Sequence, residues 1–598
     1  MIKERLAQLR QLMEKNQIQY YIIPTNDYHL SEYVGDYFRA RKYMSGFTGS
    51  AGVLVVTPSD AGLWTDGRYY IQAERQLEGS TITLFRQGTE GVPTIEEWLE
   101  KNIQPGENIG FDGRVIPAAS GILYEKIAGK QGGHVVYQQD LVDEIWTDRP
   151  QLSGEPAFAL DVCYTGRSTA DKLAAVREAM REKGADLHVL TSLDDIAWLL
   201  NIRGNDVECN PVILSYVAVT LNAVYFFADE KKLNEEIKAL FEENHVTVLP
   251  YNDIYTWLEN NSRTQTVMYN LGKINYAIYK SIDSSVQTVN CENPTLLMKA
   301  IKNDVEINNL IKAHIKDGVA VTKFMYWLKN NVGKIPMTEI SASDYLENCR
   351  RAQDGFIELS FDTISAYKAN AAMMHYSANA QSNAVLEPEG LLLVDSGGQY
   401  YEGTTDITRT FGLGPVSDEI KKHYTAVLRG MLNLANARFL HGCIGLNLDI
   451  LARGPMWDMG IDYRCGTGHG VGYLLNVHEA PNGFRWKKVP ERDDGCVLEA
   501  GMVTTDEPGI YEEGSHGIRI ENELVCREGE KNEYGQFMYF ETITYAPIDL
   551  DVIDTTYMTD VDLKRLNDYH QMVYEKISPY LDTEEREWLK VYTRPLEK

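Results

Sequence analysis

Two aspartates about two thirds of the way along the chain, Asp395 and Asp406, have a spacing that could bind metal. They lie in residues 391–411, LLLVDSGGQYYEGTTDITRTF, where an apolar run ends at Asp395 and a Thr/Ile-rich run contains Asp406. Glycines between the two runs predict a β-hairpin. If its turn is centred between Tyr400 and Tyr401, the carboxylates lie opposite each other, with Cβ atoms about 5 Å apart.

Carboxylates at this separation repel each other unless they are protonated or bind a cation. Two divalent ions about 3.5–4 Å apart, bridged by carboxylates and water, would stabilise the pair and would form a hydrolytic catalyst. The alternative is two solvated acids beside a surface loop, and the pair alone favours this alternative. Further ligands are needed before the metal hypothesis is preferred.

A glycine-rich segment supplies a candidate nitrogen ligand. Residues 464–480, RCGTGHGVGYLLNVHEA, contain His469 among glycines and His478 nine residues later. The glycines indicate backbone packed closely against a neighbour. A nucleotide-binding loop is rejected, because the segment has neither GxGxxG spacing after a strand nor the lysine of a P-loop. A single histidine is more often structural than a ligand, so His469 gains weight only in combination.

Residues 502–525, MVTTDEPGIYEEGSHGIRIENELV, repeat the layout of the first hairpin. Glu507 and Glu521 are symmetric about Gly514 and lie between strand-like runs, which predicts a second hairpin with a second acid pair. Four carboxylates and one imidazole are then available for metal. These five candidate ligands are Asp395, Asp406, His469, Glu507 and Glu521. Mostly oxygen donors suit Mn²⁺ or Co²⁺ better than a structural zinc site.

Length and composition exclude several classes of protein. A chain of 598 residues is expected to form two to four domains. The formal charge of -28 argues against binding to nucleic acid, whose phosphates would be repelled. The N-terminus lacks the apolar core of a signal peptide, and no apolar run of about 18 residues predicts a membrane span. Eight scattered cysteines without a CxxC pair fit reduced thiols in the cytoplasm.

The chain begins with two similar patterns of helix, strand and turn. The first has Leu6, Leu9, Leu12 and Met13 at helical spacing, followed by the apolar run QYYIIP. A Pro/Gly/Ser-rich stretch at residues 148–156 has the character of a linker. The second pattern opens with STADKLAAVREAMREKG, with Ser168 or Thr169 as N-cap and Gly184 at the C-terminus. Two related α/β domains are therefore predicted.

A third, larger α+β domain is predicted to hold the acidic hairpins. Its first helical region, residues 293–331, is expected to be interrupted near Asp317 and Gly318. The helical tail either covers this domain or forms a subunit contact. The predicted domains are residues 1–155, 156–295 and 296–598.

The order of the five candidate ligands resembles the dimetal site of the pita-bread metallopeptidases. Further segments resemble the three-domain aminopeptidase P (Xaa-Pro aminopeptidase) family within that group, whose two N-terminal domains are creatinase-like. These segments are SGFTGSAG, TDGRYYIQA, YTGRSTADKL, LDDIAWLLNIRGNDVECNPVILSY, DSGGQYYEGTTDITRT, GTGHGVG, TDEPGIY and GIRIENE. They extend over nearly the whole chain.

The resemblance implies a role for each ligand. Asp395 would chelate one ion, Asp406 and Glu521 would bridge both ions, and His469 and Glu507 would complete the second. A water shared by the ions would lose its proton and attack the scissile carbonyl as a bridging hydroxide. Glu507 could carry the proton to the leaving proline nitrogen.

The resemblance also implies residues that act on the substrate. His375 matches a histidine that stabilises the substrate carbonyl or oxyanion, and His478 matches one near the residue after the cleaved bond. Arg519 is expected on the same strand face as Glu521, where it could orient a carboxylate. Arg68 matches an arginine that reaches a peptide from a partner subunit, whereas its alternative role is an ion pair with Asp66.

One position departs from the family pattern. Family members carry histidine four residues before the metal-binding histidine, where this chain has Cys465. A thiol with a pKa near 8.5 is mostly neutral and substitutes poorly for imidazole. Cys465 is not expected to act as a nucleophile, because no base and orienting group are evident beside it.

The resulting prediction is a cytoplasmic, homodimeric metallopeptidase that removes the N-terminal residue of peptides with proline in second position. It would use two divalent ions, Mn²⁺ before Co²⁺ or Zn²⁺. The first alternative is a prolidase, which cleaves only Xaa-Pro dipeptides. The second is a pita-bread binding protein without catalysis, which is disfavoured because all five ligands are present.

Overall fold

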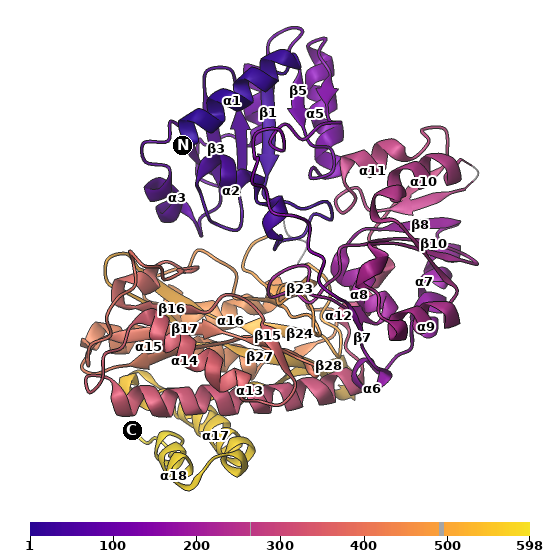
Figure 1. Cartoon of the computed structure of the whole chain (residues 1–598). Coiled ribbons are helices and arrows are strands. Elements are labelled where there is room, and N and C mark those ends of the chain that lie inside the picture. The colour runs from indigo at the N-terminus through magenta and orange to yellow at the C-terminus, as the bar shows by residue number, and fades with distance from the viewer. Residues whose placement is uncertain (264, 490–494) are drawn as a thin grey trace. The chain divides into compact units, whose positions relative to one another are not determined.

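The computed structural model describes residues 1–263, 265–489 and 495–598, and the chain forms two compact units (Figure 1). Unit 1 comprises Met1–Asp161 and Arg167–Thr295, and unit 2 comprises Val162–Gly166 and Leu296–Lys598. The division into three domains at residues 155 and 295 stays a prediction.

Unit 1 contains two six-stranded sheets with equivalent strand orders, β4-β3-β2-β1-β5-β6 and β12-β11-β10-β8-β13-β14. In each sheet the strand that comes first in the chain, β1 or β8, is antiparallel to one neighbour and parallel to the other. The strands of the first sheet are β1 (Tyr20–Pro24), β2 (Val53–Val56), β3 (Ala61–Thr65), β4 (Thr83–Arg86), β5 (Ile109–Phe111) and β6 (Val135–Val136). Those of the second are β8 (Leu187–Leu190), β10 (Tyr216–Thr220), β11 (Val224–Phe227), β12 (Val246–Leu249), β13 (Val267–Tyr269) and β14 (Thr288–Asn290). The prediction of two related α/β domains is confirmed.

The predicted helices of unit 1 are also present. Helix α1 (Ile2–Lys15) buries Leu6, Leu9 and Met13, which lie on one face because of their helical spacing. Helix α7 (Thr169–Glu182) has Ser168 as its N-cap, and the serine hydroxyl accepts the N–H of Asp171. Gly184 follows the helix with φ of +66°.

Unit 2 combines antiparallel sheets with long helices. The largest sheet has the order β21-β28-β27-β24-β22-β23, and a second sheet has the order β16-β17-β20. Its principal strands are β16 (Ile364–Tyr367), β17 (Leu391–Ser396), β20 (Ile407–Gly412), β21 (Arg438–Leu440), β22 (Gly468–Gly470), β23 (Glu479–Phe484), β24 (Val503–Asp506), β27 (Asn522–Asn532) and β28 (Gly535–Thr542). Helices α15 (Asp418–Ala435) and α16 (Gly445–Trp457) contribute to the core that covers the larger sheet.

The long helix of unit 2 differs from its prediction. Helix α12 (Pro294–Ala300) ends before Asn303, which caps α13 (Asp304–Asn331), so the break lies about fifteen residues before the predicted interruption. Helix α13 continues through Asp317 and Gly318. A Cβ at Gly318 would lie 2.3 Å from the carbonyl oxygen of Tyr545. The glycine therefore allows close packing and does not end the helix, so the predicted interruption is wrong.

The C-terminal tail packs on unit 2. Helices α17 (Asp560–Ile577) and α18 (Thr583–Tyr592) place Leu566, Val573 and Leu589 in the core cluster that also contains α15 and α16 residues. The sequence left two roles open for the tail, and the first of them, covering this part of the chain, is confirmed.

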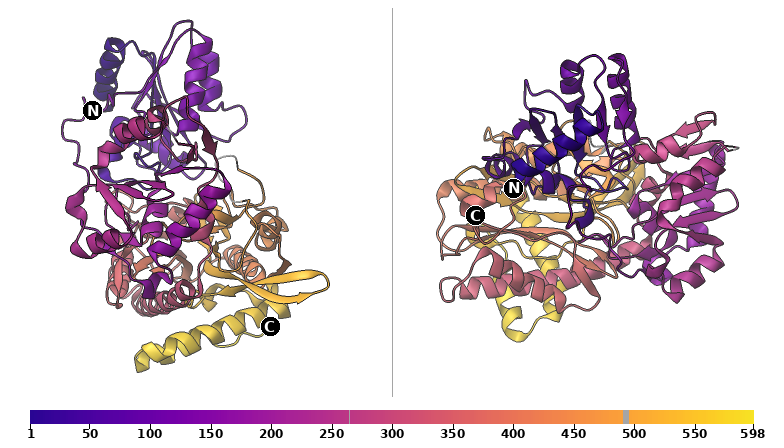
Figure 2. Two further views of the ribbon diagram at one scale, coloured as in Figure 1. Left: turned by 90° about the vertical axis from the view of Figure 1, so that its right-hand side faces the viewer. Right: turned by 45° about the horizontal axis from the view of Figure 1, so that its top comes forward.

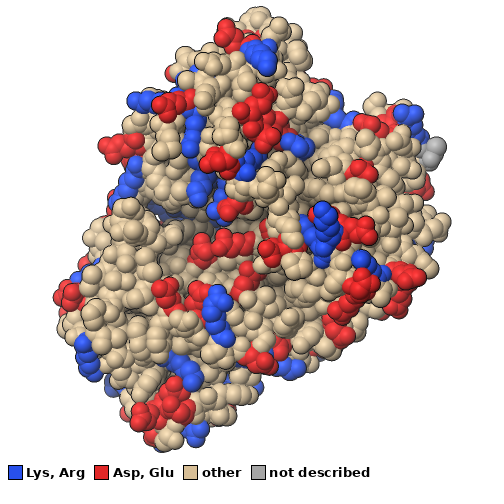
Figure 3. All heavy atoms as spheres, viewed as in Figure 1, with Lys and Arg blue, Asp and Glu red and all other residues tan. Residues whose placement is uncertain are grey.

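The surface of unit 2 includes one long hairpin. Strands β27 and β28 continue beyond the sheet as a ribbon whose tip is exposed, and Figure 2 shows this ribbon projecting from the unit. Acidic side chains are distributed over the visible face in Figure 3, in keeping with the net charge of -28. None of the helices in the described part of the chain combines the length and the hydropathy that a membrane span needs.

Candidate metal centre

The first hairpin positions Asp395 and Asp406 diagonally. Asp395 lies in β17 and pairs with Thr408 of β20, while Asp406 directly precedes β20. The prediction that the two aspartates lie directly opposite each other is wrong, because the residue opposite Asp395 is two positions after Asp406. Because Thr408 and Asp406 are two residues apart, Asp406 still points to the same face as Asp395.

The shift arises at the turn of this hairpin. Short strands β18 (Gly398–Tyr400) and β19 (Gly403–Thr404) keep the register of β17 and β20, so the turn is centred between Tyr401 and Glu402. Gly403 has φ of +132°, which a residue with a side chain rarely adopts, and this glycine fixes the turn one residue later than predicted.

The second hairpin has the predicted centre. Strand β24 pairs with β27, and the short strands β25 (Gly509–Glu512) and β26 (His516–Arg519) pair in the same register about Gly514. Glu507 and Glu521 occupy the matching interruptions between these strand pairs. This register places the two glutamates across from each other.

His469 lies in β22, which pairs with β24 of the second hairpin. Its Nδ1 is 2.9 Å from the carbonyl oxygen of Gly470, so that nitrogen carries the hydrogen and Nε2 is left as the ligand atom. Nε2 lies 3.5 Å from Asp406 Oδ2 and 3.5 Å from Glu507 Oε1. His469 therefore joins a carboxylate from each hairpin.

The glycines around His469 allow close strand packing. A Cβ at Gly468 would lie 1.8 Å from the carbonyl oxygen of Thr505, and one at Gly470 would lie 2.3 Å from that of Glu479. The neighbour that the sequence left unidentified is therefore the backbone of the adjacent strands.

Gly468→Ala should lower the melting temperature, because no flexible side chain can move away from the added methyl group. We expect a loss of about 2 kcal/mol or more in unfolding free energy. Gly129→Ala in α5 (Ala118–Lys130) is the matched control, since a Cβ there would meet no atom within 4 Å, and it should be neutral or stabilising. Thermal unfolding of both variants measures the difference, and equal melting temperatures would contradict the packing argument.

The cluster fits divalent cations. Ligand atoms of Asp406, His469 and Glu521 lie within 4.8 Å of one another. Asp395 Oδ1 and Glu521 Oε1 are buried and have no hydrogen-bond partner among the residues that the structure describes. Buried carboxylate oxygens without donors are compensated by metal ions, and the oxygen-rich donor set suits hard or borderline divalent ions.

Electrostatics support the same assignment. Burial and the neighbouring carboxylates of Glu521 and Asp395 raise the pKa of Asp406 well above its usual range. Burial, then Glu507 and Asp395, raise the pKa of Glu521 well above its usual range. Burial also raises the pKa of Glu507, with Asp395 adding to the increase. Without a cation, burial and mutual repulsion therefore favour the protonated form of each acid.

Arg519 orients the carboxylates, although toward Asp395 and not directly toward Glu521. Its guanidinium donates to Asp395 Oδ2 at 2.5 Å, to the hydroxyl of Tyr511 at 2.6 Å and to Thr408 Oγ1 at 3.1 Å. The Thr408 hydroxyl in turn donates to Glu521 Oε2 at 2.7 Å. One arginine thus fixes two of the candidate ligands, one directly and one through threonine.

Arg519→Lys should weaken metal binding or activity by about 10- to 100-fold, because an ammonium cannot donate to three partners in one plane. Arg527→Lys is the control, since Arg527 pairs with Glu541 on the β27–β28 ribbon away from the cluster. Titration of metal-stripped protein with Mn²⁺ measures the effect. Unchanged affinity and activity in Arg519→Lys would argue against an orienting role.

The structure places His478 beside the cluster. Its ring centroid is 4.4 Å from that of His469, with the ring planes at 89°. The next residue, Glu479, forms ion pairs with Lys302 and with Lys299, the latter at 2.7 Å. The two lysines hold the residue after His478, and the sequence interpretation missed them because they lie about 180 residues upstream.

His375 lies in the loop after the 3-10 turn Lys368–Ala372. The neighbouring Tyr376 anchors this loop by donating to Glu339 at 2.8 Å. A Cβ at Gly517 of β26 would lie 1.8 Å from the carbonyl oxygen of Ala371, so the loop packs tightly on the strand that ends at Arg519. The action of His375 on substrate stays a prediction.

Arg68 lies in unit 1 and is paired within that unit. It binds Asp66 through two hydrogen bonds of 2.9 and 2.8 Å, which is the structural alternative considered from the sequence. Contact with a peptide stays a prediction.

Cys465 lies close enough to the cluster for Glu507 to change the pKa of its thiol. Burial, then Glu507, raise its pKa to about 11, so the thiol is neutral at physiological pH. A neutral thiol is a weak nucleophile, in agreement with the sequence interpretation.

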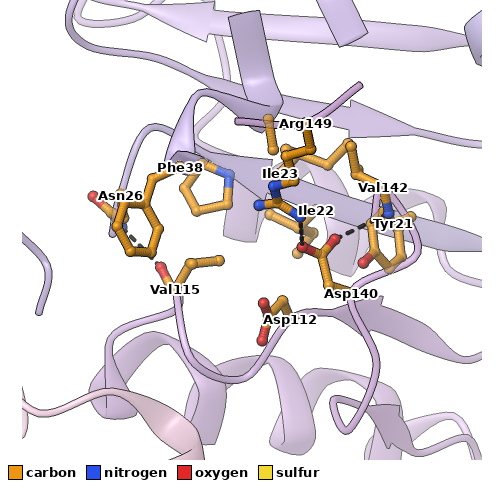
Figure 4. Close-up of a pocket in the computed structure, with 12 residues that line it drawn as sticks. Tyr21, Ile22, Ile23, Asn26, Phe38, Asp112, Val115, Asp140, Val142 and Arg149 are labelled. Atoms are coloured by element: carbon orange, nitrogen blue, oxygen red, sulfur yellow. Dashed lines mark hydrogen bonds and ion pairs between the residues drawn. The ribbon is translucent and has the colours of Figure 1, made fainter. Parts of the chain in front are cut away.

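Unit 1 also contains a pocket (Figure 4), but its charged groups are already paired. Asp140 binds Arg149 at 2.7 Å, and Asp112 binds Arg114 at 2.9 Å. Tyr21, Phe38 and aliphatic side chains form much of the remaining wall. The pocket holds none of the predicted site residues, and we assign no ligand to it.

Comparisons with protein families cover most of the chain. Residues 5–145 and residues 148–306 each match the creatinase/prolidase N-terminal domain. Residues 308–528 match metallopeptidase family M24, and residues 536–596 match the C-terminal region of that peptidase group. The predicted fold class, two creatinase-like α/β domains followed by a pita-bread domain, is confirmed.

Individual proteins are similar over the full length. A probable Xaa-Pro aminopeptidase P of Laccaria bicolor is 38% identical over 618 residues, covering 99% of this chain and 93% of that protein. The crystal structure of X-prolyl aminopeptidase from Caenorhabditis elegans, described as a cytosolic enzyme with a di-nuclear active site, is 36% identical with a TM-score of 0.94 and covers 100% of both chains. A Xaa-Pro dipeptidase from Bacillus anthracis is 26% identical with a TM-score of 0.52 and covers only 64% of this chain.

Proposed function

Because the chain belongs to the Xaa-Pro aminopeptidase (aminopeptidase P) family of M24 metallopeptidases, we propose that it removes the N-terminal residue from peptides whose second residue is proline. The observation that carries this proposal is the convergence of four acids and one imidazole in a chain similar to these enzymes over its whole length.

Asp395, Asp406, His469, Glu507 and Glu521 would hold two divalent ions. When bound, such ions make a water nucleophilic near neutral pH and polarise the scissile carbonyl. The chain's own residues prepare this chemistry. Arg519 and Thr408 hold Asp395 and Glu521 in fixed orientations, so little reorganisation is needed when substrate binds.

Glu507 is suited to move a proton. Its side chain is 22% exposed, compared with 7% for Asp406, so it is the more open of the two carboxylates beside His469. Burial keeps its pKa above the usual value, which helps a carboxylate to accept and return a proton. It would deliver that proton to the proline nitrogen, which has no hydrogen of its own. His375 would stabilise the substrate carbonyl or oxyanion, and His478, beside His469, would lie near the residue after the cleaved bond.

The metal is proposed to be Mn²⁺, with Co²⁺ or Zn²⁺ as alternatives, because the donors are mostly oxygen. We also propose a cytoplasmic location, which is supported by the reduced-thiol pattern of the sequence and by the cytosolic description of the nematode relative, and a homodimeric state. Arg68 is proposed to reach peptide from the partner subunit.

A length series of substrates tests the proposed specificity. Tripeptides and longer peptides of the form Xaa-Pro-Xaa should be cleaved by the Mn²⁺-loaded protein, with release of the first residue alone. Mass spectrometry of the products identifies the cleaved bond. Turnover restricted to Xaa-Pro dipeptides would instead indicate a prolidase.

A further inference from the structure

Glu523 is a buried acid beside the metal cluster that lies outside the five candidate ligands. It is two residues after Glu521 on β27, and it is 0% exposed. Its Oε1 accepts the backbone N–H of Asp406 at 2.7 Å. Glu523 therefore contacts the backbone of one candidate ligand, Asp406.

This contact lies where strand pairing ends. The paired residues of β17 and β20 stop at Ser396 and Ile407, so Asp406 is just outside the ladder. A backbone N–H at this position needs an acceptor from elsewhere, because an unpaired buried N–H is costly. Glu523 provides that acceptor and thereby fixes the peptide unit that orients the Asp406 side chain.

His314 of helix α13 contacts the same carboxylate oxygen of Glu523. The ring is 0% exposed, with Nε2 3.1 Å from Glu523 Oε1 and Nδ1 2.8 Å from the carbonyl oxygen of Leu310. Nδ1 is thus bonded within the helix, and Nε2 is in ion-pair contact with Glu523 without forming a well-aligned hydrogen bond to it. Helix α13 in this way supports the cluster although it contributes none of the five candidate ligands.

We propose that His314 and Glu523 are positioning residues, which together fix the backbone of Asp406 in an orientation from which its carboxylate could bind divalent metal. This inference rests on the proposed role of Asp406 as a metal ligand. Removing a residue that orients a metal ligand typically lowers metal affinity by about 10- to 100-fold. His314→Gln should therefore weaken binding of at least one Mn²⁺ equivalent by that factor.

The test titrates the metal-stripped full-length protein with Mn²⁺ and follows binding calorimetrically. The matched control is His570→Gln, because His570 is also a fully buried histidine of unit 2, where it accepts the N–H of Ile548. His314→Gln should lower affinity and lower kcat at saturating Mn²⁺, with KM changed less than about twofold. The control should bind Mn²⁺ as the wild type does. Equal affinity in His314→Gln and the control would overturn the proposal.

Two variants of Glu523 provide a second test. Glu523→Gln keeps a carbonyl oxygen that can accept the Asp406 N–H, whereas Glu523→Ala does not. Glu523→Gln should retain Mn²⁺ affinity between those of the wild type and Glu523→Ala, and equal affinities of all three would overturn the proposal. If the wild type binds two Mn²⁺ but cleaves no Xaa-Pro peptide, the proposed function fails while the positioning result is still readable.

Discussion

Replacing Glu507 with glutamine should lower kcat for Xaa-Pro cleavage by about 10³-fold or more, because the variant loses both a metal ligand and a proton carrier. Glutamine has nearly the same size, and Thr505, which donates to Glu507 Oε1 at 3.3 Å, can donate to an amide oxygen as well. The fold should therefore persist. Activity and Mn²⁺ content are measured on the same preparation.

The control for this variant is Glu513→Gln. Glu513 is an exposed acid at the tip of the same hairpin, so its loss changes net charge equally without touching the cluster. It should leave kcat within about twofold. Glu507→Gln activity within tenfold of the wild type would contradict the proposed proton transfer.

Metal removal should make stability depend on pH in an unusual direction. Asp406 and Glu521 have pKa values raised well above their usual range, first by burial and then by neighbouring carboxylates. The folded metal-free protein therefore binds more protons than the unfolded chain. The contribution of these two carboxyl groups to stability is complete below their unfolded-state pKa of about 4. It is lost as the pH rises through their pKa values in the folded protein.

Divalent ions should reverse this loss, because they bind the deprotonated carboxylates. The increase in melting temperature on adding Mn²⁺ should thus grow from pH 5.5 to pH 8, reaching several degrees when Mn²⁺ exceeds its Kd about 100-fold. Melting curves with and without Mn²⁺ across this range measure it. Asp406→Asn removes one of the repelling charges and should flatten the dependence, whereas an increase that does not vary with pH would contradict the cation site.

Sequence reasoning succeeded where local spacing determines structure. The symmetry of Glu507 and Glu521 about Gly514 gave the correct register, since a Gly with positive φ marks that turn. The first hairpin was misplaced by one residue because Tyr401 and Glu402 carry no turn signature. Gly318 was taken as a helix interruption, although its packing against Tyr545 explains the glycine within a continuous helix.

Contacts between residues far apart in the sequence could not be predicted from local sequence patterns. His314 precedes Glu523 by 209 positions in sequence, and only the packing of α13 near β27 brings the two together. The Thr408 hydroxyl between Arg519 and Glu521 was missed for a similar reason, since a threonine in a β-strand is ordinary. These residues position the candidate ligands, but no sequence pattern connects them with the ligands.

The second hairpin keeps one register on both sides of its acid pair, with Val503 opposite Val525 and Gly509 opposite Arg519. The tip at residues 513–515 is exposed, and a Cβ at Gly514 would meet no atom within 4 Å. The pairing of the glutamates therefore rests on strand ladders on both sides of them as well as on the turn at the tip. Gly514 offers an insertion point at which a fluorescent reporter can be carried seven residues from Glu507 and Glu521 while their pairing is retained.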